Sequence, residues 1–129
     1  MILIDSSAWV GCLRDTGSPV CEEVDRLLGA EIATSDPVLM EVLAGARDTR
    51  HLGQLRALPG RAQMRHCRAE DYETAAHLYR SCRDGGETVR QLVDCLIAAV
   101  AIREELLVLH QNQDFSALAR HPPLRVHQV

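Results

Sequence analysis

Short apolar runs alternate with longer segments of helical periodicity along this chain, and this alternation is the strongest constraint on its fold. Buried strands that alternate with helices form βαβ units, in which the strands are parallel and helices cover both faces of the sheet. The sequence therefore predicts a single α/β domain over residues 1–129, with a central parallel sheet of about four to five strands flanked by helices. The apolar runs that predict strands lie at 2–4, 31–34, 62–67, 106–109 and 124–126.

Capping and stop signals predict where the helices begin and end. Ser18-Pro19 starts a helix that Gly29 ends, and Asp36-Pro37 starts another that ends near Gly45. The segment from 92 to 102 is apolar on nearly every side except at Asp94, which predicts a central buried helix. Further helices are predicted over about 48–58, 69–83 and 115–119.

All fourteen basic residues are arginine, and the absence of lysine excludes several enzyme classes. P-loop nucleotide-binding proteins, receiver domains and haloacid-dehalogenase-type phosphatases all rely on a lysine. No apolar run is long enough to span a membrane or to serve as a secretory signal, so we expect a soluble, cytoplasmic protein with no membrane partner.

The cysteines and aromatic residues carry little functional signal. The five cysteines are odd in number and form no CxxC pair, which fits neither a zinc site nor a disulfide framework. We therefore expect them to be reduced, buried apolar side chains. Trp9, Tyr72 and Tyr79 are expected in the core, since four aromatic residues are too few for a base-stacking surface.

Four carboxylates lie in or beside the most apolar segments, where an unpaired charge is costly. Asp5 ends the first predicted strand, and Asp114 follows the run at 106–109. Glu41 and Asp94 interrupt apolar helices, and Arg90 is the one arginine that local helical spacing brings within reach of Asp94. Strand ends that meet at one sheet edge would gather these charges, and a divalent cation such as Mg²⁺ or Mn²⁺ would neutralise them.

Each of these carboxylates also has a purely structural interpretation. Asp5 would cap the first helix, and Glu41 would lie on an exposed helix surface. Asp94 would stabilise the start of its helix, because a negative charge interacts favourably with the helix dipole there. Asp114 would be an ordinary turn residue. It is the occurrence of all four at matching topological positions that favours a metal site.

Four segments of the chain carry these residues: MILIDSSAW at the N-terminus, PVLMEVLAGA at 37–46, VRQLVDCLIAAVA at 89–101 and LHQNQDFSALA at 109–119. They resemble the four signature segments of PIN-domain ribonucleases, most closely the VapC-type toxins. The resemblance covers nearly the whole chain, in order. It implies that Asp5, Glu41, Asp94 and Asp114 are catalytic, that Asp5, Asp94 and Asp114 bind the metal, and that Ser7 and Asn112 lie in a secondary shell. Asn112 stands where the family often has Asp, which removes one negative charge.

The resemblance also implies an activity and its partners. We expect an endoribonuclease in which a metal-activated water, deprotonated with the help of a carboxylate such as Glu41, hydrolyses tRNA or ribosomal RNA. It would be the toxin of a toxin–antitoxin pair, neutralised by a VapB-type antitoxin, and a homodimer. The rival hypothesis is a non-catalytic α/β module that uses a metal-bridged acidic cleft to bind nucleotides or protein, and the Asn112 departure favours it.

One stretch of the chain is basic although the formal net charge is −4. Residues 47–68 hold six arginines and one acidic residue, and such a cluster either follows a phosphate backbone or is a solvated surface. The predicted RNA contacts are Arg47, Arg50, Arg56, Arg61 and His110.

Overall fold

The central element of the fold is a parallel sheet with the strand order β3-β2-β1-β4. The computed structural model describes residues 1–14, 17–57, 59–120 and 124–127. Within these ranges the strands are β1 (Ile2–Ile4), β2 (Ile32–Ser35), β3 (Gln63–Arg65) and β4 (Leu107–Leu109). Every neighbouring pair runs parallel, so the predicted α/β class with a parallel sheet is confirmed.

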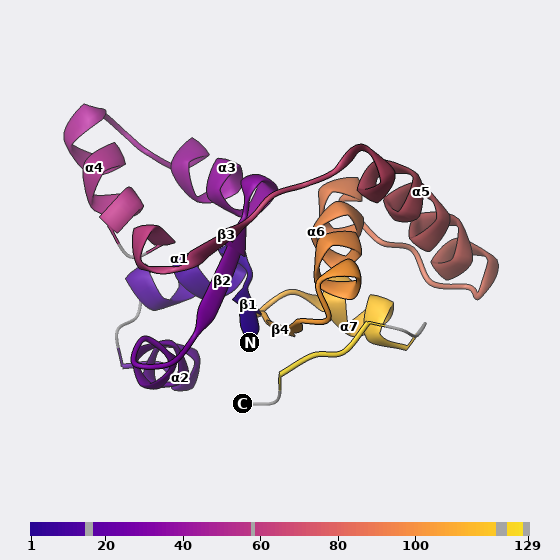
Figure 1. The fold of residues 1–129 in the computed structure, drawn as a ribbon, viewed down its shortest axis with the longest axis horizontal. Helices are drawn as coiled ribbons and strands as arrows, with labels where there is room; N and C mark the ends of the chain where they lie inside the picture. Colours follow the sequence, from indigo (N-terminus) through magenta and orange to yellow (C-terminus); the bar gives the residue numbers. More distant parts are fainter. Residues whose placement is uncertain (15–16, 58, 121–123, 128–129) are drawn as a thin grey trace.

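Helices cover both sides of the sheet (Figure 1). On one side lie α1 (Ser6–Arg14), α2 (Pro19–Leu27), α3 (Asp36–Ala44) and α4 (Thr49–Ala57), followed by the short 3-10 helix η1 (Pro59–Arg61). On the other side lie α5 (Ala69–Asp84), α6 (Leu92–Arg103) and α7 (Gln113–Ala119). None of the helices in the described ranges has the length and apolar character needed to cross a membrane.

The predicted capping signal at Ser18 is confirmed, whereas the last predicted strand is not. The Ser18 hydroxyl accepts a hydrogen bond from the Cys21 backbone N–H at 3.2 Å, at the start of α2. At 124–126, by contrast, Val126 forms only an isolated parallel bridge with Val108. Because Val108 alone exchanges backbone hydrogen bonds with this segment, the pairing does not extend into a strand.

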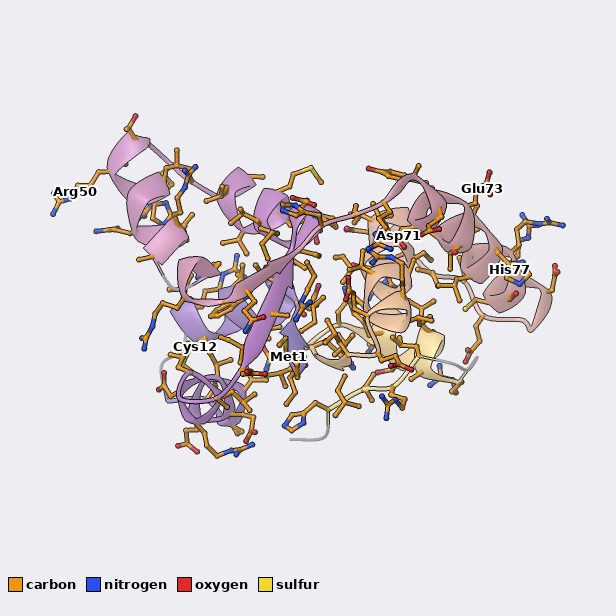
Figure 2. The ribbon with its side chains drawn as sticks, viewed as in Figure 1. Met1, Cys12, Arg50, Asp71, Glu73 and His77 are labelled. Carbon is orange, nitrogen blue, oxygen red and sulfur yellow. A yellow bond between two sulfur atoms is a disulfide. The ribbon has the colours of Figure 1, made fainter. Side chains whose placement is uncertain are left out.

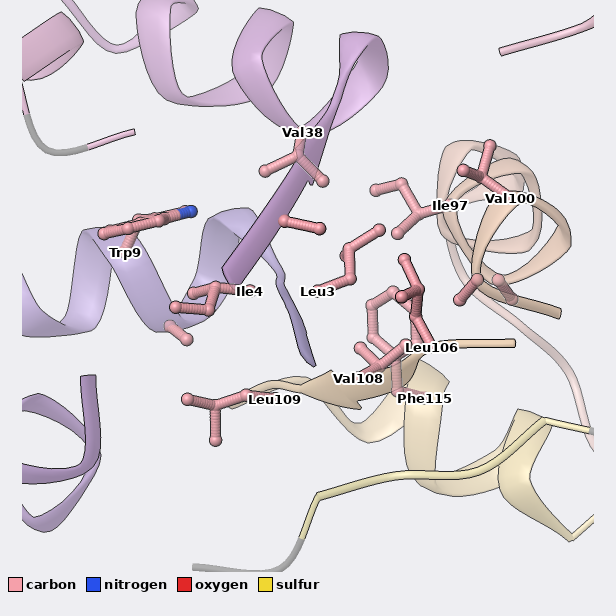
Figure 3. Packing of buried hydrophobic residues seen from close by; sticks show 14 of the residues in the cluster. Leu3, Ile4, Trp9, Val38, Ile97, Val100, Leu106, Val108, Leu109 and Phe115 are labelled. Atoms are coloured by element: carbon pink, nitrogen blue, oxygen red, sulfur yellow. The ribbon is translucent and has the colours of Figure 1, made fainter. Parts of the chain in front are cut away.

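The core lies between the sheet and α6 and continues beneath α1 (Figure 3). Leu3 of β1 and Val108 of β4 are fully buried together with Ile97 of α6 and Phe115 of α7. Trp9 of α1 is also fully buried, as the sequence predicts. These contacts hold the N-termini of α1 and α6 close to the strand ends, where the functional residues lie.

The buried side of α5 includes Asp71 and does not include Tyr72. Asp71 is buried and receives hydrogen bonds from Arg103 Nε and Nη2, both at 2.9 Å. Since this ion pair turns Asp71 toward α6, the neighbouring Tyr72 is left 61% exposed, and its expected place in the core is wrong. Tyr79 is half-buried and packs against the core.

Two of the cysteines form a disulfide, which corrects the expectation of five reduced cysteines. Cys12 of α1 is bonded to Cys21 of α2, and both are buried. Sequence spacing did not reveal the pair because two adjacent helices, and not a local motif, bring the sulfurs together. Cys67, Cys82 and Cys95 are free, as expected, but only Cys82 and Cys95 are buried, and Cys67 is half-buried.

We expect reduction of the Cys12–Cys21 disulfide to lower the free energy of unfolding, because the bond closes a short loop in the unfolded chain. For a sequence separation of 9 residues, the loss is about 2–3 kcal/mol. Urea unfolding with and without a phosphine reductant measures it. The Cys12→Ala/Cys21→Ala protein is the control and should not respond to the reductant. Equal unfolding midpoints for the oxidised and reduced parent would contradict the prediction.

Candidate active site

The sheet topology brings the ends of β1 and β4 together, and acidic residues follow both strands. Ile4 pairs with Leu109 in register, and the Asp5 backbone N–H donates to the Leu109 carbonyl at 2.9 Å. Asp5 therefore lies at the carboxyl edge of the sheet, where ligands of open α/β sheets bind. Asp114 lies in the first turn of α7, just after β4, and Asp94 lies in the first turn of α6.

Three carboxylates from three parts of the chain meet at this edge, and we refer to Asp5, Glu41 and Asp94 as the acid cluster. One oxygen from each lies within 4.8 Å of the others. Asp5 and Asp94 are buried, whereas Glu41, which projects from α3, is half-buried. The structure thus gathers three of the four predicted residues around one point.

Asp5 both caps a helix and contributes to the acid cluster. Its Oδ2 accepts hydrogen bonds from the Ser7 backbone N–H at 3.0 Å and from Ser7 Oγ at 2.6 Å, as in a helix cap. Its Oδ1 is buried and has no hydrogen-bond partner among the described residues. A buried oxygen without a donor is costly unless a ligand satisfies it, so Oδ1 is the natural position for a cation contact.

Two neighbouring serines hold the site together. Ser7 Oγ also accepts a hydrogen bond from the Gln111 backbone N–H at 2.9 Å, which links α1 to the segment after β4. Ser6 Oγ donates to Glu41 Oε1 at 3.0 Å and so orients that carboxylate. Of the two serines only Ser7 was predicted from the sequence, and the position of Ser6 beside it in the DSS motif was the available signal.

Asp114 lies beside the acid cluster and is occupied by backbone donors. Its Oδ1 accepts from the Arg90 N–H at 3.0 Å, and its Oδ2 accepts from the Gln91 N–H at 3.1 Å. The Arg90 guanidinium lies 3.7 Å from Asp114 Oδ1. This arginine therefore pairs with Asp114 and not with Asp94, the partner that local helical spacing had indicated. Asp114 therefore anchors the segment that leads into α6.

Asn112 connects α7 to the acid cluster. Its Oδ1 accepts a hydrogen bond from the Asp114 N–H at 2.9 Å, and its Nδ2 donates to Asp94 Oδ2 at 3.0 Å. Because a backbone N–H can only donate, the amide oxygen must face Asp114 and the amino group must face Asp94. In this geometry Asn112 offers the cluster a donor, where an aspartate would add a fourth negative charge.

The neighbouring carboxylates of Asp94 and Asp114 differ in their pKa, one being raised and the other lowered. Burial raises the pKa of Asp94, the hydrogen bond with Asp114 and the charge of Asp5 add to this, and the result is a pKa of about 8. Burial also acts to raise the pKa of Asp114, but its bonds with Asp94, Arg90 and Gln91 prevail and hold that pKa below its usual range. Asp94 therefore holds the proton that the pair shares.

The remaining titratable groups of the site are shifted by burial. Burial raises the pKa of Asp5 against the hydrogen bonds from Ser7. It also raises the pKa of Glu41, to which the negative charge of Asp5 adds. Burial lowers the pKa of His110, so the ring is neutral near neutral pH, and its Nδ1 accepts from the Asn112 N–H at 3.2 Å.

The donor set suits a hard divalent cation. Carboxylate oxygens converge from Asp5, Glu41 and Asp94, and oxygen ligands are those that Mg²⁺ and Mn²⁺ prefer. Asp5 Oδ1 has no hydrogen-bond partner among the described residues, and the pKa of Asp94 is raised. Both observations indicate that a positive charge at this point would stabilise the cluster. A cation there would satisfy the buried oxygen and replace the shared proton.

Two depressions flank the acid cluster. The first, the Glu41 groove, has a volume of about 620 Å³, and the second, the Arg90 hollow, of about 470 Å³. Residues lining the Glu41 groove include Val10, Leu13, Arg14, Glu41, Arg47 and His51. Residues lining the Arg90 hollow include Ser7, Arg90, Gln91, Gln111, Gln113 and Asp114. Each depression thus has arginine in its lining.

The arginines of residues 47–68 do not form one surface. Arg47 lines the Glu41 groove, whereas Arg50 projects outward from α4 (Figure 2). Arg56 and Arg61 are exposed. Farther along the chain, Arg65 lies 3.6 Å from Glu104, and Arg68 lies at the same distance from Glu70, so these two have acidic partners.

Comparison with known proteins identifies the class to which this fold and site belong. The PIN domain family matches residues 2–121. VapC ribonuclease Mb1587 of Mycobacterium bovis and ribonuclease VapC11 of Mycobacterium tuberculosis are each 46% identical to this chain over 124 residues, which cover 93% of it and 92% of the relative. The chain therefore belongs to the PIN domain family and, within it, to the VapC ribonucleases. The resemblance found in the sequence is confirmed.

Solved structures share the fold across nearly the whole chain. A DNA-bound VapBC complex from Salmonella typhimurium matches with a TM-score of 0.78 at 19% identity, covering 98% of both chains. VapC20 of Mycobacterium tuberculosis, described as a Sarcin-Ricin loop cleaving toxin, matches with a TM-score of 0.68 at 22% identity, covering 91% of this chain and 94% of that one. At these identities the likeness establishes the fold.

We expect the metal-free protein to lose stability as pH rises from about 4 to about 8. Asp94 keeps its proton in the folded state up to a pKa of about 8, whereas the unfolded chain releases it near 3.8. The folded state thus binds more protons in this window, and the free energy of unfolding falls as pH rises.

Asp94→Asn should reduce this fall by more than about 1.4 kcal/mol, the equivalent of one pKa unit. Urea titrations in EDTA at several pH values measure it. Glu73→Gln, which removes an exposed carboxylate on α5, is the matched control and should keep the parent slope. If the free energy of unfolding of the Asp94→Asn protein fell with pH as steeply as that of the parent, Asp94 would ionise normally.

Proposed function

We propose that this chain is an Mg²⁺- or Mn²⁺-dependent endoribonuclease, the toxin component of a VapBC-type toxin–antitoxin pair. The observation that supports it best is the convergence of Asp5, Glu41 and Asp94 at the sheet edge, where the buried Asp5 Oδ1 has no donor among the described residues. Membership of the VapC ribonucleases supports the reaction class. A non-catalytic binding module is disfavoured, because the relatives at 46% identity are named ribonucleases.

The residues divide into those that hold the cation and those that handle protons. Asp5 and Asp94 would hold the ion, with Ser7 fixing Asp5 and Asn112 fixing Asp94. Asp114, which the resemblance implies as a third metal ligand, accepts two backbone N–H groups and would position Asp94. When bound, the ion supplies positive charge that offsets the carboxylates and polarises the scissile phosphate. Clustered negative charge would otherwise repel the RNA.

Glu41 is the residue best placed to accept a proton. It is the most open member of the acid cluster, and burial together with the charge of Asp5 raises its pKa, which makes it a better base. It takes a proton from the attacking water as the water oxygen bonds to phosphorus. The bond from phosphorus to the 3′ oxygen breaks, and that oxygen gains a proton, which leaves 5′-phosphate and 3′-hydroxyl ends.

The proposal includes the partners expected of such a toxin. RNA, of the tRNA or ribosomal class, is the substrate, and a VapB-type antitoxin is the protein partner. The solved complexes that share the fold contain VapBC pairs from several bacteria, which supports the second assignment. A homodimer of the chain remains part of the proposal.

We expect Asp94→Asn to abolish RNA cleavage without unfolding the protein. Loss of an anionic ligand removes several kcal/mol of transition-state stabilisation, so the rate should fall at least about a hundredfold. Cleavage of total RNA is followed with Mg²⁺, with Mn²⁺ and with EDTA, and sequencing of the ends locates the sites. Glu73→Gln should cleave like the parent. Equal parent activity in EDTA and in Mg²⁺ would exclude metal dependence.

We expect Arg47 and Arg50 to differ in their contribution to RNA binding, although they are three residues apart. Arg47 lines the groove that contains Glu41, whereas Arg50 points away from it. Arg47→Gln should weaken binding and lower the slope of log Kd against log salt by about 0.7, the value for one contact with single-stranded RNA. Arg50→Gln should leave the slope unchanged. Equal slopes in the two variants would place the RNA elsewhere.

A further inference from the structure

The Arg90 hollow lies beside the acid cluster, but none of the three carboxylates of the cluster lines it. Ser7 and Asn112, which bond to Asp5 and Asp94, line the hollow and connect it to the cluster. The Glu41 groove is lined by Glu41 and by other residues from α1, α3 and α4. An RNA strand whose scissile phosphate reaches the acids therefore has two separate depressions nearby that its nucleotides can enter.

The backbone of Arg90, which lines this hollow, is held in position by Asp114. Both oxygens of Asp114 accept backbone N–H groups, one from Arg90 and one from Gln91. These bonds fix the backbone, while the Arg90 side chain, which pairs with Asp114, is 70% exposed and lines the hollow. Its guanidinium lies near one carboxylate, but the 3.7 Å separation from Asp114 Oδ1 leaves its N–H donors available.

The charge of Arg90 matters because of what surrounds it. It is the one arginine that lines the hollow among the residues the structure describes there, and the acids nearby repel a phosphate backbone. A guanidinium binds a phosphate with two parallel hydrogen bonds, which are stronger than bonds between neutral groups. Arg90 therefore supplies the attraction that this side of the site needs.

The other side chains of the hollow are suited to a base. Gln91 and Gln113 are exposed, and neither carboxamide has a hydrogen bond to another described residue. A carboxamide offers both donors and an acceptor, which is the combination that base edges present. Unstacked bases of single-stranded RNA expose those edges.

We propose that the Arg90 hollow is a nucleotide subsite of the RNA-binding site, in which Arg90 binds a backbone phosphate and Gln91 and Gln113 contact the adjoining base. The proposal rests on the proposed ribonuclease function and names where part of its substrate binds. It makes Arg90 a substrate-binding residue and the two glutamines determinants of base preference.

The first test measures binding without cleavage. In an Asp94→Asn background with Mg²⁺, Arg90→Gln should raise the Kd for a short labelled single-stranded RNA of mixed sequence about tenfold and lower the salt slope by about 0.7. Arg90→Lys should restore part of the loss. Arg80→Gln, which removes an exposed arginine of α5 outside the hollow, is the matched control and should bind like the background protein.

The second test maps cleavage sites on total RNA. Gln91→Ala/Gln113→Ala in the otherwise unchanged protein should still cut, but with a weaker base preference at one position next to the scissile phosphate. An unchanged preference would overturn the assignment of the glutamines. Equal Kd and slope for Arg90→Gln and Arg80→Gln would overturn the subsite. Absence of metal-dependent cleavage by the parent would instead refute the proposed function, so the two failures are distinguishable.

Discussion

Repulsion among carboxylates buried at one edge of a parallel sheet is the constraint on which the local structure depends. Each acid is stabilised differently: Asp5 by Ser7, Asp114 by two backbone N–H groups, and Asp94 by a retained proton and the Asn112 amide. These bonds fix the starts of α1, α6 and α7 relative to β1 and β4. Hydrogen bonds within the fold therefore stabilise these carboxylates, except at Asp5 Oδ1, which has no partner among the described residues.

That exception links structure to activity. Protons and a divalent cation compete for the same oxygens, because either one offsets the same crowded charge. The acid cluster is thus balanced between a protonated state and a metal-bound state. Arginines on both flanks, Arg47 in the Glu41 groove and Arg90 in its hollow, supply the longer-range attraction for a polyanion that the cluster itself repels.

Sequence patterns predicted the elements well, because strands and helices depend on local periodicity and capping. The apolar runs at β1 and β4 and the cap at Ser18 are examples. Patterns failed where a distant partner decided the outcome. Arg103 pairs with the buried Asp71 while Tyr72 is exposed, and the packing of α1 on α2 brings Cys12 to Cys21.

The sequence by itself determined which carboxylates are candidates for the site, because a carboxylate in an apolar segment is costly wherever the segment folds. Asp5, Glu41, Asp94 and Asp114 stood out for that reason, and the structure brings oxygens of the first three together. Only the tertiary structure decided how they differ. Hydrogen-bond partners come from elements up to 104 residues apart, as with Ser7 and Gln111. Asp114 faces the backbone of Arg90 and Asp94 keeps a proton because of contacts between α6 and α7, which local spacing does not encode.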